Sequence, residues 1–465
     1  MAAPADQPLS EEILALSTYI AQAAARPLPE EVARKTRWHL LDTVGAIVSG
    51  TQLAAGLQGS RFASSMGGVE EALAVGSRSL LPAAQSAFAN AMAAHGDETD
   101  DSHLVGRCHP GCAIVPAALA IAERQDADGA ALLRAIALGY DVCVRVNVAL
   151  GFPSPAKAKH STHSIGPAFG AAAASAALLG LDARQARHLL SYAAQQASGI
   201  PFWNRDPYHV EKAFDFAAMP ARNGTLGALM VASGFTGTED PLTGQHNLFA
   251  AYAEKPDRAA LVDGLGSRFE IMRASIKKWC VGSPIQAVLD AIVAITGGHP
   301  QSPDAIEAIT FTMPDDRIHI IDDRSMPDVC VQHMAAVVLL DGSASFAAAH
   351  DLPRMQDAAV RALRAKMALV PSPDLTVAVP ARQAIVEIRF ADGEQRRHHA
   401  VAVRGTPENP MPEQEVEAKV LDLCAPLLGD TRSAALVKAL RTIEARRVRE
   451  LRPLLHLNDM PESHP

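Results

Sequence analysis

Residues 82–123 read PAAQSAFANAMAAHGDETDDSHLVGRCHPGCAIVPAALAIAE, and this stretch decides the fold. Its two ends, 83–94 and 113–124, are rich in Ala and apolar residues, so we predict a helix at each. Between them lies a polar loop with four carboxylates and three histidines. Such a loop between core helices is costly unless it is solvated or used for chemistry.

The same Ala-rich character extends over the first 270 residues or so. The segment Glu11–Gly50 has apolar residues at helical spacing, and Pro27 and Pro29 divide it into two predicted helices. Glycines and prolines at 151–155 and 234–244 indicate breaks. We predict further helices at 129–150, 164–179, 183–198 and 223–233.

The pattern changes near residue 270. Residues 305–313 alternate and are rich in Ile, Thr and Phe, which predicts a strand. Two more strands, 383–390 and 397–403, flank an Asp-Gly turn and predict a hairpin. Helices are predicted at about 283–297, 327–341 and 354–369, and again after Pro412 as far as Ala445. The sequence therefore predicts a mainly α chain with a smaller α+β module.

Composition narrows the class of protein. The chain has 465 residues, a net charge of −9 and only 5% aromatic residues, which argues against nucleic-acid binding. The first twelve residues lack a signal-peptide pattern, and the longest run without charge, 160–181, is too rich in Ala and Gly for a membrane span. Six scattered cysteines without a CxxC motif indicate reduced thiols. We expect a cytoplasmic protein without a membrane or nucleic-acid partner.

The polar loop supports two functional interpretations from its residues alone. It can be a metal site built on His95, Asp100, His103 and His109, since His and carboxylate are both ligands. It can equally be a metal-free site in which His109 or a carboxylate moves a proton. The structural alternative is an exposed acidic loop that caps a helix.

A second polar cluster holds Lys157, Lys159, His160 and His163, just before a predicted helix. Cations beside a helix N-terminus favour an anion, whereas the alternative is a basic surface loop. Three other polar spots are Lys212, Lys277 and the pair Gln332-His333. The chain has no GxGxxG, Walker, GxSxG or HExxH motif, so nucleotide cofactors and common hydrolase mechanisms have no support.

The order of these pieces resembles the MmgE/PrpD family. The matching blocks are LLDTVGAIVSG (40–50), the stretch quoted above, KHSTHSIGPAFGAAAASAALLGL (159–181), GALMVASGFTG (227–237), KKWCVGSPIQAVLDA (277–291) and VVLLDG (337–342). They cover about residues 10–405. The family includes 2-methylcitrate dehydratase, cis-aconitate decarboxylase and iminodisuccinate epimerase.

The resemblance implies a two-domain architecture. A large all-helical domain is expected at 1–269 with 405–465, and a smaller α+β lid is inserted at 270–404. The active site is expected in the cleft between them. Because known members act without a metal or organic cofactor and are commonly homodimers, we expect no cofactor, no metal, a polycarboxylate substrate and a homodimer.

The resemblance also suggests site residues. The family's acidic loop reads Asp-x-Asp-Asp-Thr, and here Glu98 and Ser102 replace its first and last residues. His109 matches the HPG histidine, His160 a second histidine six residues before a Gly, and Lys212 and Lys277 two lysines. We therefore expect the catalytic residues to be His109, His160, Lys212, Lys277, Glu98 and Ser102. Substrate binding is expected of Asp100, Asp101, His103, Arg107, His163 and His333.

His333 is the largest departure from the family pattern. In cis-aconitate decarboxylase a Tyr stands at this position, eight residues before the Asp of LLDG. The exchange replaces a weak acid with a pKa near 10 by one near 6.5.

The expected chemistry follows from these residue types. Lysines bind the substrate carboxylates and stabilise a developing enolate, while one histidine takes a proton and another protonates a leaving hydroxyl. We expect a cofactor-independent lyase, most simply a dehydratase of the 2-methylcitrate type. A decarboxylase or epimerase needs the same residues, and a metallohydrolase or a non-catalytic carboxylate-binding protein is a more distant alternative.

Overall fold

The structure is a computed structural model that describes residues 8–152 and 159–457. Its described chain divides into two units by internal contacts. The first comprises residues up to 96, 100–274 and from 423 onward, and the second comprises 97–99 with 275–422. Three residues of the acidic loop, Asp97–Thr99, thus belong to the second unit. The function of that unit as a lid stays a prediction.

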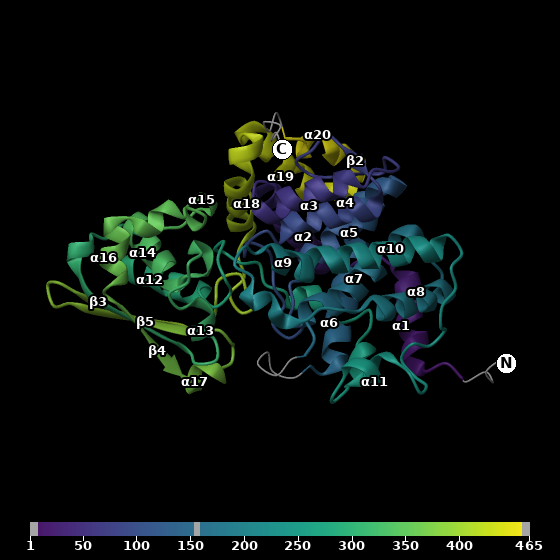
Figure 1. Ribbon diagram of the computed structural model, residues 1–465, viewed down its shortest axis with the longest axis horizontal. Helices are drawn as coiled ribbons and strands as arrows, with labels where there is room; N and C mark the ends of the chain where they lie inside the picture. The colour runs from purple at the N-terminus through teal and green to yellow at the C-terminus, as the bar shows by residue number, and fades with distance from the viewer. Residues whose placement is uncertain (1–7, 153–158, 458–465) are drawn as a thin grey trace. The chain divides into compact units, whose positions relative to one another are not determined.

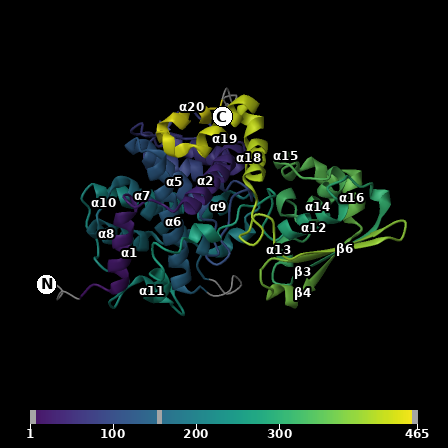
Figure 2. The ribbon, with the colours of Figure 1, turned by 180° about the vertical axis from the view of Figure 1, so that it is seen from behind.

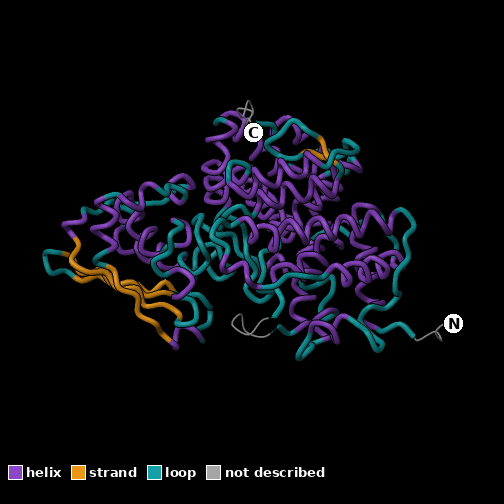
Figure 3. Tube along the Cα trace, viewed as in Figure 1, coloured by secondary structure: helices purple, strands orange, loops and turns teal. Residues whose placement is uncertain are grey.

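The first unit is mainly helical, as predicted (Figure 3). It is not wholly helical, because Ala72–Leu73 (β1) and Leu80–Leu81 (β2) form a small antiparallel sheet that the sequence did not predict. Its helices are α1 (Glu11–Ala23), α2 (Glu30–Gly50), α3 (Ala54–Ser65), α4 (Ala83–Ala94), α5 (Gly111–Gln125), α6 (Gly129–Leu150), α7 (Thr162–Leu179), α8 (Ala183–Gln196), α9 (Val210–Ala213), α10 (Met219–Ala232), α11 (Leu248–Tyr252), α19 (Asp430–Arg441) and α20 (Arg452–Leu455).

Small residues set the core of this unit. Helices α6 and α7 cross where Gly139 faces Gly170, and a Cβ added at Gly170 would lie 2.6 Å from the carbonyl oxygen of Gly139. The Ala-rich face of α7 is buried on α5 and α6. Close backbone approach therefore explains why so much of the sequence is Ala and Gly.

One segment departs from α-helical geometry. Between α9 and α10, residues Phe214–Ala218 (η3) form a single turn of π-helix. Such turns insert an extra residue into a helix and are frequent at functional sites. The sequence predicted a helix only from 223, and so missed this turn.

The second unit is α+β. Its sheet has the order β4-β3-β5-β6, with β3 parallel to β4 and antiparallel to β5. Figures 1 and 2 show α12, α14 and α16 on one side of this sheet. The elements are α12 (Gln286–Thr296), β3 (Ile306–Pro314), α13 (Ile318–Ile321), α14 (Val331–Asp341), α15 (Phe346–Ala349), α16 (Ala358–Arg364), β4 (Met367–Ser372), α17 (Pro373–Thr376), β5 (Ala384–Phe390) and β6 (Gln395–Ala400). Helix α18 (Glu413–Leu428) runs from the second unit into the first.

The predicted hairpin is confirmed. Residues alternate between buried and exposed along β5, and Gly393 at the turn has a φ of +87°. The predicted helix 354–369 is wrong in its second half, because α16 ends at Arg364 and Met367–Ser372 is the edge strand β4. A short apolar run such as MALV does not by itself distinguish helix from strand.

All six cysteines are buried and carry free thiols, which confirms that part of the prediction. Within 8–152 and 159–457, no single helix has the length and apolar character to span a membrane, although α2 and α3, bent by 85°, pass that test as a pair.

Candidate active site

The acidic loop between α4 and α5 is buried. The exposed fractions of Asp97, Glu98, Asp100 and Asp101 are 3%, 5%, 0% and 0%. The alternative of an exposed, helix-capping loop is therefore wrong. Since buried carboxylates need partners, the contacts of each one indicate its role.

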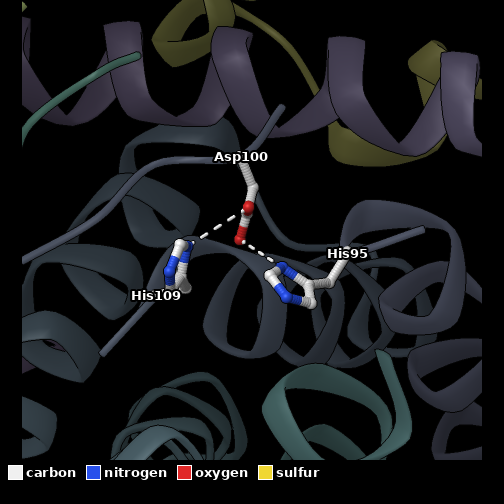
Figure 4. Close-up of side chains that lie close together, drawn as sticks. All are labelled: His95, Asp100 and His109. Atoms are coloured by element: carbon white, nitrogen blue, oxygen red, sulfur yellow. Dashed lines mark ion pairs between the residues drawn. The ribbon is translucent and has the colours of Figure 1, made fainter. Parts of the chain in front are cut away.

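Asp100 lies between two histidines (Figure 4). Its Oδ2 is 3.0 Å from Nδ1 of His95, and its Oδ1 is 3.3 Å from Nδ1 of His109. His95 is the C-cap residue of α4, and His109 lies two positions before the first residue of α5. Two helix ends therefore aim their imidazoles at one carboxylate.

This trio has the composition of a cation site. One ligand atom from each of His95, Asp100 and His109 lies within 4.8 Å of the others, and all three residues are buried. Two histidines and a carboxylate suit a transition metal. The same trio equally forms a proton-transfer group, in which the carboxylate orients an imidazole.

Asp101 has a different set of partners. Its Oδ2 is 2.7 Å from Nδ1 of His39 and accepts a hydrogen bond from the Tyr140 hydroxyl at 2.6 Å. Its Oδ1 accepts from the backbone N of Gly111 at 2.9 Å. Burial acts to raise the pKa of Asp101, but the bonds from His39 and Tyr140 hold that pKa below its usual value. Asp101 thus anchors the start of α5, next to His109.

Gly111 is required by the crowding at this point. A Cβ added there would lie 2.7–2.8 Å from side-chain oxygens of Thr43, Tyr140 and Asp101. This gives a physical reason for the Gly of the HPG sequence.

An aromatic ring organises the other site side chains of the first unit. The His163 ring stacks on Phe216, with centroids 3.8 Å apart and an interplanar angle of 5°. His95 stacks on the same ring at 4.7 Å, and Lys212 Nζ is 5.3 Å from its centroid. His109 and His163 have ring centroids 5.4 Å apart. Phe216 belongs to the π-helical turn, which sequence analysis missed.

His160 occupies a different environment. Its ring packs edge-on against Tyr252, with centroids 4.8 Å apart, and no ring contact of the described chain joins it to His109. Helix α7 starts at Thr162, so His163 is in its first turn while His160 precedes it. His160 was expected to be catalytic and His163 to bind substrate, but of these two it is His163 that lies next to His109.

Lys159, the one lysine of the basic cluster within the described residues, lies at the surface. Lys159 has an 81% exposed side chain with Glu254 4.0 Å away, and Lys157 lies outside the described residues. Arg107 has a φ of +49°, and its Nη1 donates to the carbonyl of Phe152 at 3.2 Å. Ser161 stands at the N-cap of α7 without a side-chain cap bond and donates to Asp215, with an O–O distance of 2.5 Å.

His103 bonds to the backbone through both ring nitrogens. Nδ1 accepts from Gly106 N at 2.9 Å, and Nε2 is 3.2 Å from the carbonyl oxygen of Glu270. Burial lowers the pKa of His103 to about 4, so the ring is neutral at pH 7. Ser102 beside it is 3% exposed. These contacts give His103 a role in holding the 103–108 turn.

In the second unit, Lys277 is paired with Glu98. Its Nζ donates to the backbone carbonyl of Glu98 at 2.8 Å and lies 3.4 Å from Oε2. Both side chains are almost fully buried, at 3% and 6% exposed. A buried cation beside a carboxylate is costly to build, and removal of one partner leaves the other charge buried and uncompensated.

His333 lies in α14 and is 0% exposed. Neither ring nitrogen has a hydrogen-bond partner among residues 8–152 and 159–457. Burial, with smaller contributions from Arg364 and Arg354, lowers its pKa to about 4. The value near 6.5 expected from the residue type is therefore wrong here, because the expectation ignored burial.

An open pocket in the first unit is a separate feature. It is lined by Phe62, Phe88, Phe214, Tyr208 and Glu211, among others, and by none of the predicted site residues.

Comparison with known families gives matches over most of the chain. Residues 14–260 match the MmgE/PrpD N-terminal domain, and residues 279–444 match the MmgE/PrpD C-terminal domain. The chain is 24% identical to human cis-aconitate decarboxylase over 442 residues, which is 90% of this chain and 88% of that protein. It is 25% identical to mouse cis-aconitate decarboxylase over 364 residues, 73% of this chain and 71% of the mouse protein. A cis-aconitate decarboxylase-like protein of Aspergillus oryzae is 26% identical over 233 residues, 48% of this chain and 47% of that protein.

Proposed function

Because the chain belongs to the MmgE/PrpD family, we propose that it is a lyase that acts on a di- or tricarboxylate by removing a proton next to a carboxylate. The observation that carries this proposal is the buried Asp100 carboxylate between His95 and His109. It supplies a preorganised proton acceptor in the loop where the family resemblance expects one.

His109 is the proposed base. If its Nδ1 carries the proton shared with Asp100 Oδ1, its Nε2 is left with a lone pair that can accept the substrate proton. The carboxylate then stabilises the imidazolium that forms. His109 is 8% exposed, against 0% for His95 and Asp100, so it is the member of the trio with most access from outside.

Lys212 and Lys277 are the proposed cations for the substrate carboxylates. The Lys212 ammonium lies over the Phe216 ring, on which His163 also stacks. Lys277 is buried beside Glu98. Lys212 belongs to the first unit, and Lys277 with Glu98 to the second. A cation against the enolate oxygen stabilises the charge left after proton removal.

Dehydration is our first proposal for the reaction type. After loss of the proton, the C–O bond breaks and the leaving hydroxide takes a proton to become water. His163, next to His109, and His160, suggested by the resemblance, are the candidate donors. His333 is unsuited to this step, since a pKa of about 4 leaves it without a proton to give at pH 7.

Decarboxylation is the second proposal, supported by the names of the relatives. It needs no acid for a hydroxide, which fits a neutral His333. In this reaction a C–C bond to a carboxylate breaks in place of a C–H bond: CO2 leaves, and the carbon then takes up a proton. Epimerisation requires only the removal of one proton and the return of a proton to the opposite face of the same carbon.

We test these proposals with a panel of di- and tricarboxylic acids in heavy water, followed by NMR with EDTA present. We expect one member to exchange a proton or to be consumed, and its product to distinguish dehydration, decarboxylation and epimerisation. Activity that appears only after zinc, iron or manganese is added would replace the proposal with the metal-dependent use of His95, Asp100 and His109. Tight binding of a carboxylate without any turnover would indicate a non-catalytic binding protein.

A further inference from the structure

Three consecutive residues of the acidic loop each contact a different basic side chain of the second unit. The Asp97 Oδ2 is 3.1 Å from Nε2 of His350. The Glu98 carbonyl accepts from Lys277 Nζ at 2.8 Å. The Thr99 carbonyl accepts from Lys419 Nζ at 2.9 Å. Only Lys277 was indicated by the sequence.

The contacts of the two lysines are almost free of solvent, whereas the His350 side chain is 21% exposed. Asp97, Glu98 and Thr99 are 3%, 5% and 0% exposed, and Lys277 and Lys419 are 3% and 7% exposed. Surface ion pairs contribute little because water and salt screen them. Here, loss of one ammonium group would leave a buried carbonyl without that donor, a cost that surface pairs do not carry.

Helix α18 supports this arrangement at two points. It carries Lys419, and its Asp422 accepts from the backbone N of Phe346 at 2.7 Å, where α15 begins. His350 caps the other end of α15, with Nδ1 2.8 Å from the Phe346 carbonyl oxygen. One helix therefore reaches the loop segment directly through Lys419 and indirectly through α15 and His350.

The segment is also ordered internally. Asp97 Oδ1 accepts from the backbone N of Thr99 at 3.0 Å, and its Oδ2 accepts from the Thr99 hydroxyl. This turn encloses Glu98, whose backbone carbonyl and side chain both face Lys277. With its neighbours anchored on both sides, the Glu98 carboxylate has little freedom to move.

We propose that Lys277, His350 and Lys419 form a clamp that fixes Asp97–Thr99, and that His350 and Lys419 are positioning residues for Glu98. The anchoring is independent of any reaction, whereas its catalytic consequence rests on the proposed function. The clamp acts on geometry, so its loss should reduce kcat much more than it changes KM. A displacement of about 1 Å at a reacting group can lower a rate by about a hundredfold.

The test compares Lys419→Met and His350→Ala with two matched exchanges in the same unit. Lys366→Met removes a lysine whose Nζ donates to the carbonyls of Pro303 and Ile306 at 2.8 and 2.7 Å. His399→Ala removes a half-buried histidine bound to Gln383. His350→Gln keeps a side-chain N–H donor for Asp97 and serves as the conservative rescue.

Two readouts are taken from each variant. Hydrogen exchange measures how fast the backbone amides exchange in the peptide that contains Thr99. Steady-state kinetics measure kcat and KM on the panel member that the protein turns over. In Lys419→Met and His350→Ala, we expect the backbone amides of this peptide to exchange about tenfold faster or more than in the wild type. We also expect kcat to fall about ten- to a hundredfold in both variants, with KM within about threefold of the wild-type value. Lys366→Met and His399→Ala should match the wild type, and His350→Gln should recover most of the loss at pH 7.

Each result decides a stated part of the proposal. If the amides of this peptide exchange at the wild-type rate in both Lys419→Met and His350→Ala, the clamp is overturned. Faster exchange with wild-type kcat would overturn the positioning role and leave the clamp as a structural anchor. If the wild-type protein turns over no polycarboxylate, the proposed function fails, and the exchange data alone decide whether the clamp exists.

Discussion

At the scale of single residues, one carboxylate is shared by two imidazoles. Asp100 contacts Nδ1 of both His95 and His109, and it is 0% exposed. In such a group the carboxylate orients the base and stabilises its protonated form, so its charge is needed as much as its shape.

We predict that Asp100→Asn lowers kcat/KM about a hundredfold or more, because the amide keeps the volume but loses the charge. Steady-state kinetics and the thermal midpoint together check this prediction. Asp126→Asn, at a C-cap with φ +49° that Asn also tolerates, is the matched control and should keep full activity. Full activity in Asp100→Asn would remove the carboxylate from the mechanism.

His333 gives a second prediction at this scale. Its ring is buried, neutral and without a hydrogen-bond partner in the described chain, so it is suited to donate one N–H to a substrate. We expect His333→Phe to raise KM about tenfold through the lost bond, and His333→Tyr to recover part of it through the phenol hydroxyl. If KM is the same in all three proteins, His333 does not contact the substrate.

At the scale of elements, the crossing of α6 and α7 explains why the first unit needs its glycines. We predict that Gly170→Ala lowers the free energy of unfolding by about 1–3 kcal/mol, because its Cβ would meet the Gly139 carbonyl. Gly227→Ala in α10 is the matched control, since the nearest atom to its added Cβ, 3.2 Å away, is a terminal side-chain methyl of Leu189 and not a backbone atom. Chemical denaturation measures both. Equal stability of Gly170→Ala and wild type would mean that the helices do not approach so closely.

His350 gives a pH-dependent prediction for the end of α15. Burial alone would lower its pKa, but the bond and charge of Asp97, with Asp328 also nearby, raise it from 6.5 to about 9. The pair thus contributes stability that is fully present below pH 6.5 and is lost as the pH rises through 9. Relative to His350→Gln, the wild type should lose up to about 3 kcal/mol of unfolding free energy over that range. If the free energy of unfolding changes by the same amount in both proteins between pH 6 and pH 9.5, the ion pair is contradicted.

Element prediction from the sequence worked where a local pattern was long. The Ala-rich helices α4, α5 and α6 and the hairpin of β5 and β6 lie close to their predicted ranges. It failed at β4 and at the π-helical turn Phe214–Ala218. Pairing with β3 makes β4 a strand, and an inserted residue makes the π-turn. Neither of these is visible in local composition.

At the scale of the whole molecule, the mainly α class and the family follow from the sequence, while the grouping of the site residues does not. His109 and Asp100 were found because they are close in the chain. Phe216 and His350 were missed because they lie more than a hundred residues away from the loop they organise. His163 and His160 could be ranked only when the start of α7 was known.

The most direct test of the central claim is proton exchange at the carbon next to a carboxylate, compared between wild type and His109→Gln. It is measured by NMR in heavy water on the active panel member, with EDTA present and with thermal midpoints recorded for both proteins. The account predicts that His109→Gln keeps its thermal midpoint and loses exchange by about a thousandfold or more. Exchange at the wild-type rate in a folded His109→Gln protein would contradict it.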